Sequence, residues 1–457
     1  YDFSDEEIAD LLEKRLELDR RIAAVVLSNE ESSEYAKLYH PYAYEDFKKF
    51  APALPLDDFF QAVIGQTPDK VIVDEERFWQ AADQFYSEEA WPLLKATLIL
   101  GVVNLSTSYL TDEIRVLSGA YGRALSGVPE AQDKVKAAYH LAQGPFKQAL
   151  GLWYAHEKFS PEAKADVEKK VATMIDVYKE RLAKNDWLTP ETRDKAIVKL
   201  NVIKPYIGYP EELPARYKDK VVDETASLFD NALAFARVEI KHSWSKWNQP
   251  VDYKEWGMPA HMVNAYYNPQ KNLIVFPAAI LQAPFYDLHQ SSSANYGGIG
   301  AVIAHEISHA FDTNGASFDE NGSLKDWWTE SDYAAFKEKT QKVIDQFDGQ
   351  ESYGARINGK LTVSENVADL GGIAAALEAA KREPDFSAEE FFHNFARIWR
   401  MKGRPELMKL MASVDVHAPA KLRVNVQVPN FDDFFTTYDV KEGDGMWRSP
   451  EDRVIIW

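Results

Sequence analysis

Residues 302–311, VIAHEISHAF, constrain the fold of this chain more than any other stretch. His305 and His309 stand four positions apart, with Glu306 directly after the first. Four residues of an α-helix turn through about 400°, so both imidazoles lie on one face, roughly 6 Å apart. The flanking positions are apolar, which places the helix inside the protein. Three buried titratable side chains without partners would be costly. The stretch therefore predicts a buried helix whose polar side chains hold a ligand.

The polar residues of this helix suit a catalytic metal ion. Two imidazole nitrogens at this spacing can bind one ion, and Glu306, about 100° around the helix from His305, can take a proton from a water on the metal. The alternative is a chance pattern on an ordinary helix. The composition of the chain gives roughly 0.03 expected matches to this pattern. The stretch therefore favours metal-dependent hydrolysis with Glu306 as the general base.

A third protein ligand is expected from another segment, because catalytic zinc usually takes three and leaves one position for water. TVSENVADLGG, residues 362–372, offers Glu365 and Asp369, again four apart on a predicted helix. One carboxylate can bind the metal while the other accepts a hydrogen bond from a ligand imidazole. Acidic residues at this spacing more often form a solvated face. Here the small and apolar neighbours from Val367 to Gly372 favour burial instead.

The composition limits the classes of function. The chain has 457 residues, 46% of them apolar, which is enough for a large core in two lobes. Its net charge of −20 argues against nucleic acid and anionic membrane surfaces as partners. It has no cysteine, which excludes disulfides and thiolate ligands and favours a reducing cytoplasm. The longest apolar stretch, LLKATLILGVVNL at 93–105, is shorter than the roughly 20 residues that span a bilayer and is predicted to be a buried helix.

The distribution of local patterns predicts a fold that is mainly α with minor β. Ser4 with Glu7 three residues later forms a capping box before a helical pattern, and Thr189 before Pro190 marks another helix start. Residues 205–260 are rich in Pro, Gly and Trp and are predicted to be irregular. Two short strands are expected around a turn at Asn268-Pro269. In the second half, a glycine-rich stretch leads into a helix that closes near Asn314-Gly315, and further helical patterns lie at 331–349, 364–383 and 387–403.

Four motifs follow one another in the second half of the chain. They are NAYYNPQKNLIVFPAAILQAPFYD (264–287), NYGGIGAVIAHEISHAFDTNG (295–315), SENVADLGG (364–372) and VHAPAKLRVN (416–425). This series resembles the signatures of the neprilysin-like zinc metallopeptidases. The ending at 430–457 is most similar to the bacterial branch, the endopeptidase O type. The resemblance runs from about residue 4 to the last residue and is densest from residue 260 onward.

The resemblance implies which residues form the metal centre. One zinc ion per chain would be bound by two imidazoles and one carboxylate, those of His305, His309 and Glu365. Glu306 would activate the zinc-bound water. Asp369 would orient His305, and Asp312 would support His309 without binding the metal itself.

The resemblance also implies residues that contact the substrate. His417 would stabilise the transition state and Arg423 would hold a substrate carbonyl; on sequence context alone they are more typical of a loop histidine and a surface charge. Asn264 and Ala265 match the edge-strand element that holds the substrate backbone by β-augmentation, with a turn residue as the alternative for Asn264. Four side chains would line the pocket for a large apolar substrate residue, and on sequence context alone would be core: Ile280, Phe285, Val302 and Trp399.

The implied architecture is a zincin-type metallopeptidase of two mostly helical lobes around a central cavity. Residues 1–230 would cover the active site, and residues 231–457 would carry the zinc ion. The implied activity is that of a zinc endopeptidase that hydrolyses short peptides on the amino side of large apolar residues. The alternative is a surface-exposed protein of the same family that binds host proteins with little turnover.

The resemblance bears on location and extent as well. Animal relatives are membrane-anchored and disulfide-bonded, and this chain has neither feature, so we expect a soluble bacterial protein without membrane insertion. The expected compartment is the cytoplasm, with secretion or the cell surface as the alternative. The family pattern includes an N-terminal portion before residue 4. We therefore expect this chain to be part of a longer molecule.

Overall fold

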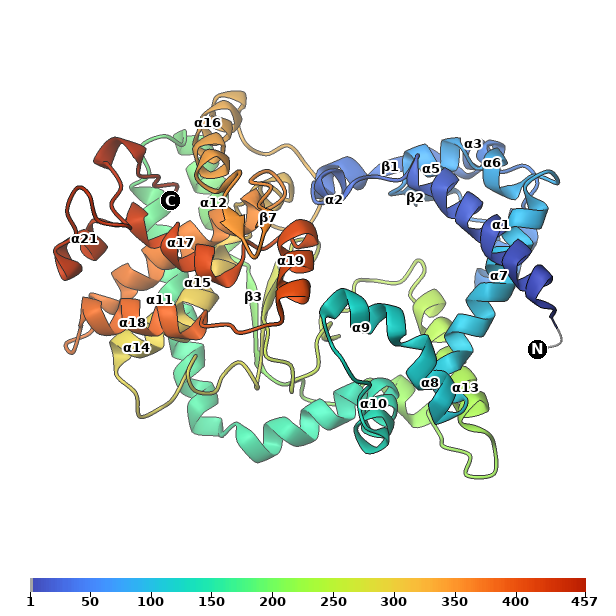
Figure 1. The fold of residues 1–457 in the computed structure, drawn as a ribbon. Helices are drawn as coiled ribbons and strands as arrows, with labels where there is room; N and C mark the ends of the chain where they lie inside the picture. Colours follow the sequence, from blue (N-terminus) through green and yellow to red (C-terminus); the bar gives the residue numbers. More distant parts are fainter. Residues whose placement is uncertain (1–2) are drawn as a thin grey trace. The chain divides into compact units, whose positions relative to one another are not determined.

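The computed structural model describes residues 3–457, which fold into two compact units (Figure 1). The first unit comprises the chain up to Pro145 together with Pro214–Val251. The second unit comprises Phe146–Leu213 and Asp252–Trp457. The sequence predicts a single boundary at residue 230, whereas each observed unit is discontinuous in the sequence. The helices within 146–213 belong to the second unit because they pack against its central helices.

The first unit consists of helices and one small sheet. In this sheet β1 (His40–Ala43) pairs antiparallel with β2 (Lys70–Val73). Tyr44, Phe47 and Val73 form the buried centre of the apolar cluster beside it. The α-helices of this unit are α1 (Asp5–Ala23), α2 (Asn29–Ser32), α3 (Tyr44–Phe47), α4 (Leu56–Ile64), α5 (Glu76–Gln80), α6 (Asp83–Tyr86), α7 (Trp91–Ser106), α8 (Asp112–Ser118), α9 (Ala120–Ser126) and α13 (Leu228–Ser245).

The helix α7 contradicts the prediction that residues 93–105 are buried. Leu98, Val102 and Leu105 are 53–74% exposed, and the buried side chains of α7 are Ala96 and Ser106. The helix is apolar around most of its circumference, and α1 packs along one side of it. The helices α1 and α6 contact α7 but leave these apolar positions accessible. Across residues 3–457, no helix is both long and apolar enough to cross a bilayer.

The predicted helix starts are confirmed. Ser4 Oγ accepts a hydrogen bond from the Glu7 amide, and the Glu7 carboxylate accepts one from the Ser4 amide, which completes the capping box of α1. Thr189 caps α12 (Pro190–Asn201) by a single hydrogen bond, in which its side-chain oxygen accepts from the Thr192 amide. Several helices were not predicted, and one of them, α13, lies inside the stretch predicted to be irregular. Its N-cap, Ser227, accepts from the amide of residue 230, a local signal that the surrounding Pro and Trp residues obscure.

The second unit contains a three-stranded sheet in the order β3-β5-β4. The two predicted strands are β4 (Tyr266–Asn268) and β5 (Leu273–Pro277), which pair antiparallel. A third strand, β3 (Lys204–Gly208), pairs parallel with β5 and was not predicted. Every residue of β5 is buried, as expected for a central strand. The strand β4 therefore lies at an edge of the sheet.

The core of the second unit is helical, with α15 and α17 packed side by side and α11 against both (Figure 1). The long helix α10 (Lys134–Lys158) enters this unit after a kink at Phe146. The kink follows Pro145, whose ring and missing amide disrupt a helix interior. The remaining α-helices are α11 (Pro161–Ala183), α12, α14 (Ser292–Asn295), α15 (Ala301–Ser308), α16 (Glu330–Phe347), α17 (Val363–Ala380), α18 (Ala388–Ile398), α19 (Pro405–Val414), α20 (Ala420–Asn425) and α21 (Asp432–Tyr438). A short hairpin joins β6 (Glu351–Ser352) to β7 (Ala355–Arg356).

Candidate metal centre

Two closely packed helices carry the candidate site. The helix α15 follows one turn of π-helix at 296–300, and all of its residues are buried. A Cβ atom on Gly372 of α17 would lie 2.8 Å from the His305 amide nitrogen and 3.0 Å from the Ala301 carbonyl oxygen. Glycine at this position therefore allows the two helices to approach closely. The approach brings Glu365, in the first turn of α17, to the histidines of α15.

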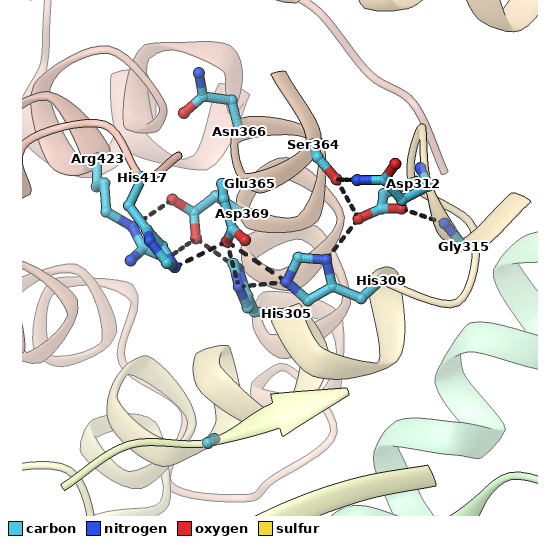
Figure 2. Close-up of polar contacts among 12 residues, drawn as sticks. His305, His309, Asp312, Gly315, Ser364, Glu365, Asn366, Asp369, His417 and Arg423 are labelled. Carbon is cyan, nitrogen blue, oxygen red and sulfur yellow. Dashed lines mark hydrogen bonds and ion pairs between the residues drawn. The ribbon is translucent and has the colours of Figure 1, made fainter. Parts of the chain in front are cut away.

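The side chains of His305, His309 and Glu365 converge (Figure 2). Their potential ligand atoms all lie within 4.8 Å of one another. The two Nε2 atoms are 3.0 Å apart, and Glu365 Oε2 lies 3.2 Å from His305 Nε2 and 3.5 Å from His309 Nε2. The structure thus brings together the three residues predicted to be ligands.

The hydrogen bonds around this cluster indicate which atoms could bind a cation. His305 Nδ1 lies 2.8 Å from Asp369 Oδ1, and His309 Nδ1 lies 2.6 Å from Asp312 Oδ2. An ionised carboxylate can only accept, so each Nδ1 donates, and a neutral imidazole then presents a lone pair on Nε2. The two Nε2 lone pairs face each other and Glu365 Oε2, a buried oxygen without a hydrogen-bond partner.

Three electron-pair donors that converge in this way form a site at which a cation can bind in place of protons. Two imidazoles and one carboxylate are a donor set that zinc accepts while it keeps a position open. The residues present therefore fit a zinc ion.

The charges of the cluster act strongly on one another. Burial and the neighbouring His309 disfavour protonation of His305, but the carboxylates of Asp369 and Glu365 outweigh both and raise the pKa of His305. Burial also opposes protonation of His309, yet Glu365 and Asp312 raise its pKa well above the usual range. Burial acts to raise the pKa of Glu365, but the surrounding histidines hold it well below the usual value. The cluster is thus an anionic pocket with bound protons that a metal ion would replace.

Glu306 is a further ionisable group of this region. It is 6% exposed, and it lies close enough to both α15 histidines and to Glu365 for their charges to act on it. Burial raises the pKa of Glu306, although the histidines oppose the shift. A raised pKa makes the carboxylate a better proton acceptor than an exposed glutamate, as a general base beside a metal position requires.

Arg423 is buried and fixed in place rather than lying at the surface. Its Nε and Nη2 atoms donate to Asp369 Oδ2 and Oδ1 at 2.8 Å and 2.6 Å. Its guanidinium also lies 3.7 Å from the centre of the Trp399 ring. Burial acts to raise the pKa of Asp369, but Arg423 and His305 together hold it at about 2. Asp369 therefore remains ionised and can orient His305.

His417 also lies at the cluster, on an exposed loop. Its Nε2 is 3.2 Å from Glu365 Oε2, and its Nδ1 is 2.8 Å from Asp415 Oδ1. The same Asp415 oxygen accepts from the backbone amide of His417. These two contacts point the imidazole toward Glu365 (Figure 2).

The other residues predicted to contact substrate lie around the sheet edge and α15. Asn264 is exposed and Ala265 is buried, and both directly precede the edge strand β4. Ile280 and Val302 are buried in the main apolar cluster. Phe285 and Trp399 are partly buried and pack against the same cluster. These four side chains are therefore core residues, as the sequence context alone indicates, and a role in a pocket remains a prediction.

Some residues of the site were not identified from the sequence. Ser364 Oγ donates to Asp312 Oδ2 at 2.6 Å, and Asp415 holds His417. Tyr178 on α11 hydrogen-bonds both Ser308 and the Ala304 carbonyl of α15. The spacing Asp-x-His is a local signal that identifies Asp415. No comparable signal exists for Tyr178, because it comes from a helix 126 residues away in sequence.

Comparison with known proteins places the chain among peptidases. Family models described as peptidase family M13 match residues 2–210 and 264–454. A Streptococcus gordonii protein, named as a zinc metalloproteinase of the scaA 5′ region, is 77% identical over 391 residues, which cover 86% of this chain and 69% of that protein. The neutral endopeptidase of Lactococcus lactis subsp. lactis is 48% identical over 455 residues, which cover 100% of this chain and 72% of that protein. The crystal structure of PepO from Lactobacillus rhamnosis superposes with a TM-score of 0.96 at 37% identity, over 100% of this chain and 72% of that one.

Proposed function

The chain belongs to peptidase family M13 as a neprilysin-like zinc metalloendopeptidase, and we propose that it binds one zinc ion through His305, His309 and Glu365 to hydrolyse short peptides. The observation that carries the proposal is the convergence of three electron-pair donors, one from the buried His305 and two from the largely buried His309 and Glu365. Both Nδ1 atoms donate to carboxylates, so the two Nε2 atoms and the Glu365 carboxylate are left to bind a cation in place of protons. When bound, zinc supplies a Lewis acid that polarises the scissile carbonyl and makes water more acidic.

Glu306 is proposed to move the proton. In its ionised form its carboxylate accepts one proton from the attacking water. It then gives this proton to the amine nitrogen as the C–N bond breaks, so the carboxylate is regenerated. Burial raises the pKa of Glu306, which makes the carboxylate a stronger base than an exposed glutamate.

His417 and Arg423 are proposed to bind the carbonyl oxygen. The Nδ1 atom of His417 is engaged by Asp415, which holds the imidazole with its Nε2 atom toward the metal cluster. Arg423 is held by Asp369 and Trp399, so its guanidinium is oriented before substrate arrives. Donors fixed in advance where negative charge develops are the most effective kind.

The substrate preference is proposed from the surroundings of the cluster. The edge strand β4 can add a substrate strand, with Asn264 and Ala265 at its start, because its outer backbone groups face no other strand of the described sheet. Phe285 and Val302 offer an apolar wall for the residue after the scissile bond, which favours cleavage on the amino side of large apolar residues. The restriction to short peptides rests on the family resemblance alone.

Cleavage of a bradykinin-sized peptide tests the proposal. The wild-type chain should cleave it, lose activity to a zinc chelator and regain it with zinc. Glu306→Gln keeps the shape of the side chain but cannot take the proton, so it should retain zinc and lose about 10²–10⁴-fold in kcat. Glu351→Gln, on the exposed hairpin, is the matched control and should behave as wild type. Turnover by Glu306→Gln above a tenth of wild type refutes the assigned base.

A further inference from the structure

Lys199 is a buried lysine that lies outside the metal cluster. It is located on α12 and is 1% exposed. Its Nζ donates to three backbone carbonyl oxygens, at 2.8 Å, 2.8 Å and 2.6 Å, which belong to Ala310, Gly315 and Phe318. Three aromatic rings surround the amine, with centres 5.6–6.0 Å away: Tyr267, Phe311 and Trp327.

Burial of this amine is costly. It lowers the pKa of Lys199 to about 7, although the charges of Asp312, Asp319 and Glu320 act in the opposite direction. A methionine would fill the same space without removing a charge from water. The three hydrogen bonds are therefore the feature that distinguishes lysine from an apolar residue at this position.

All three carbonyls belong to one short segment, residues 310–318, directly after α15. Within this segment Asp312 Oδ1 accepts from the amides of Asn314 and Gly315, at 2.8 Å and 2.6 Å. Asp312 Oδ2 accepts from His309 Nδ1 and from Ser364 Oγ (Figure 2). A continuous chain of contacts thus runs from the Lys199 amine through Gly315 and Asp312 to the imidazole of His309.

The segment has little freedom to adjust. A Cβ atom on Gly315 would overlap the His309 carbonyl oxygen and lie 2.8 Å from the Ala310 carbonyl carbon. Residue 315 is therefore folded directly against the end of α15. A displacement of this residue must move either Asp312 or the last turn that carries His309.

We propose that Lys199 is a positioning residue for the metal centre, which holds the 310–318 segment so that Asp312 stays hydrogen-bonded to His309. This inference rests on the proposed zinc function. Lys199 touches neither a ligand side chain nor the position of the substrate, so its effect should be on metal retention. It ties the helix α12, far from the motif in sequence, to the zinc-binding helix.

Zinc release to an excess of chromogenic chelator tests this role. Lys199→Met should release zinc about 10-fold faster than wild type, at the lower end of the effect of losing a hydrogen-bonded support of a metal ligand. Lys195→Met is the matched control, because Lys195 lies on the same helix and donates to Glu191 there and, at 3.4 Å, to the Trp327 carbonyl. Release from Lys195→Met should match wild type. Equal release rates for Lys199→Met and wild type overturn the proposal.

A double-substitution cycle separates positioning from general loss of stability. If Lys199 acts through Asp312, then Lys199→Met should add less than about twofold to the release rate of Asp312→Asn. If the effects of the two substitutions on the zinc release rate multiply in full, Lys199 acts independently of Asp312, and the proposal is overturned. Should Lys199→Met fail to fold, Lys199→Gln replaces it, since its amide can reach at most two of the three carbonyls. If folded Lys199→Gln then releases zinc at the wild-type rate, the proposal is overturned.

Hydrogen exchange distinguishes failure of this inference from failure of the proposed function. In the metal-free chain, Lys199→Met should speed amide exchange across 312–318 and leave α16 unchanged. If the wild-type chain bound no zinc, the proposed function would fail. The exchange measurement would still test whether Lys199 holds the 310–318 segment in place. Unchanged exchange across 312–318 overturns the role of Lys199 in either case.

Discussion

Replacement of Asp369 by alanine should separate the stability of the second unit from its affinity for zinc. Asp369 is 4% exposed and joins two partners, accepting from the Arg423 guanidinium at 2.8 Å and 2.6 Å and from His305 Nδ1 at 2.8 Å. Alanine removes all three acceptor contacts. It leaves the Arg423 charge, itself 7% exposed, buried without its carboxylate.

The expected magnitude follows from these contacts. Holding the pKa of Asp369 at about 2 instead of 3.8 corresponds to about 2–3 kcal/mol in favour of the carboxylate. This stabilisation is present at neutral pH and is lost as the pH falls through the folded pKa. Removal of one partner from a buried pair costs about 3–5 kcal/mol, because the other charge stays buried. Loss of the support for a ligand imidazole weakens metal binding about 10–100-fold.

Two measurements on two variants test this reasoning. Urea unfolding of the metal-free chain, followed by tryptophan fluorescence, should show Asp369→Ala destabilised by about 3–5 kcal/mol. Asp369→Ala combined with Arg423→Met removes the unpaired charge while keeping an apolar contact with Trp399, so most of the stability should return. Zinc affinity, measured by competition with a chelator, should remain weakened in both variants. If the free energy of unfolding of Asp369→Ala lies within about 0.5 kcal/mol of wild type, as for a surface substitution, the reasoning is refuted. Native zinc affinity in the double variant would refute it as well.

Three further results are expected. Glu365→Ala should abolish stoichiometric zinc binding, since it removes one of three ligands, and metal analysis showing one tightly bound zinc would identify a different ligand. The pKa values of His305 and His309 are raised, so protons should compete with zinc, and affinity should fall as the pH drops from about 8 to about 6 in a competition titration; a constant affinity across this range would contradict the assignment. Phe285→Ala should lower kcat/KM by about 10-fold for a peptide with a large apolar residue after the scissile bond. For a peptide with alanine at that position, kcat/KM should change little. Equal losses for both peptides would exclude a role of Phe285 in specificity.

The metal cluster could be predicted from the sequence because its geometry is largely local. His305 and His309 share a helix face by their spacing, and Glu365 and Asp369 repeat that spacing on a second helix. The sequence alone left open which carboxylate would bind the metal. In the structure Asp369 faces Nδ1 of His305 and Arg423, whereas Glu365 faces both Nε2 atoms, and this geometry favours Glu365 as the ligand.

The features that were not predicted depend on contacts between distant segments. The strand β3 consists of KPYIG, a weak strand pattern that is stabilised by its pairing with β5. The exposure of α7 depends on how many helices surround it, which hydrophobicity does not determine. Lys199 resembles any helix lysine in the sequence, and its burial becomes apparent only when the 310–318 segment is folded over it. The burial of Arg423 likewise follows from its pairing with Asp369.

Anomalous diffraction at the zinc absorption edge, from crystals of the zinc-loaded chain, tests the central claim most directly. The account predicts one strong peak per chain, within about 2.0–2.2 Å of Nε2 of His305, Nε2 of His309 and a carboxylate oxygen of Glu365. The Nδ1 atoms of the two histidines should remain hydrogen-bonded to Asp369 and Asp312. A fully occupied peak elsewhere, or a peak at this position without Glu365 among its ligands, would contradict the account.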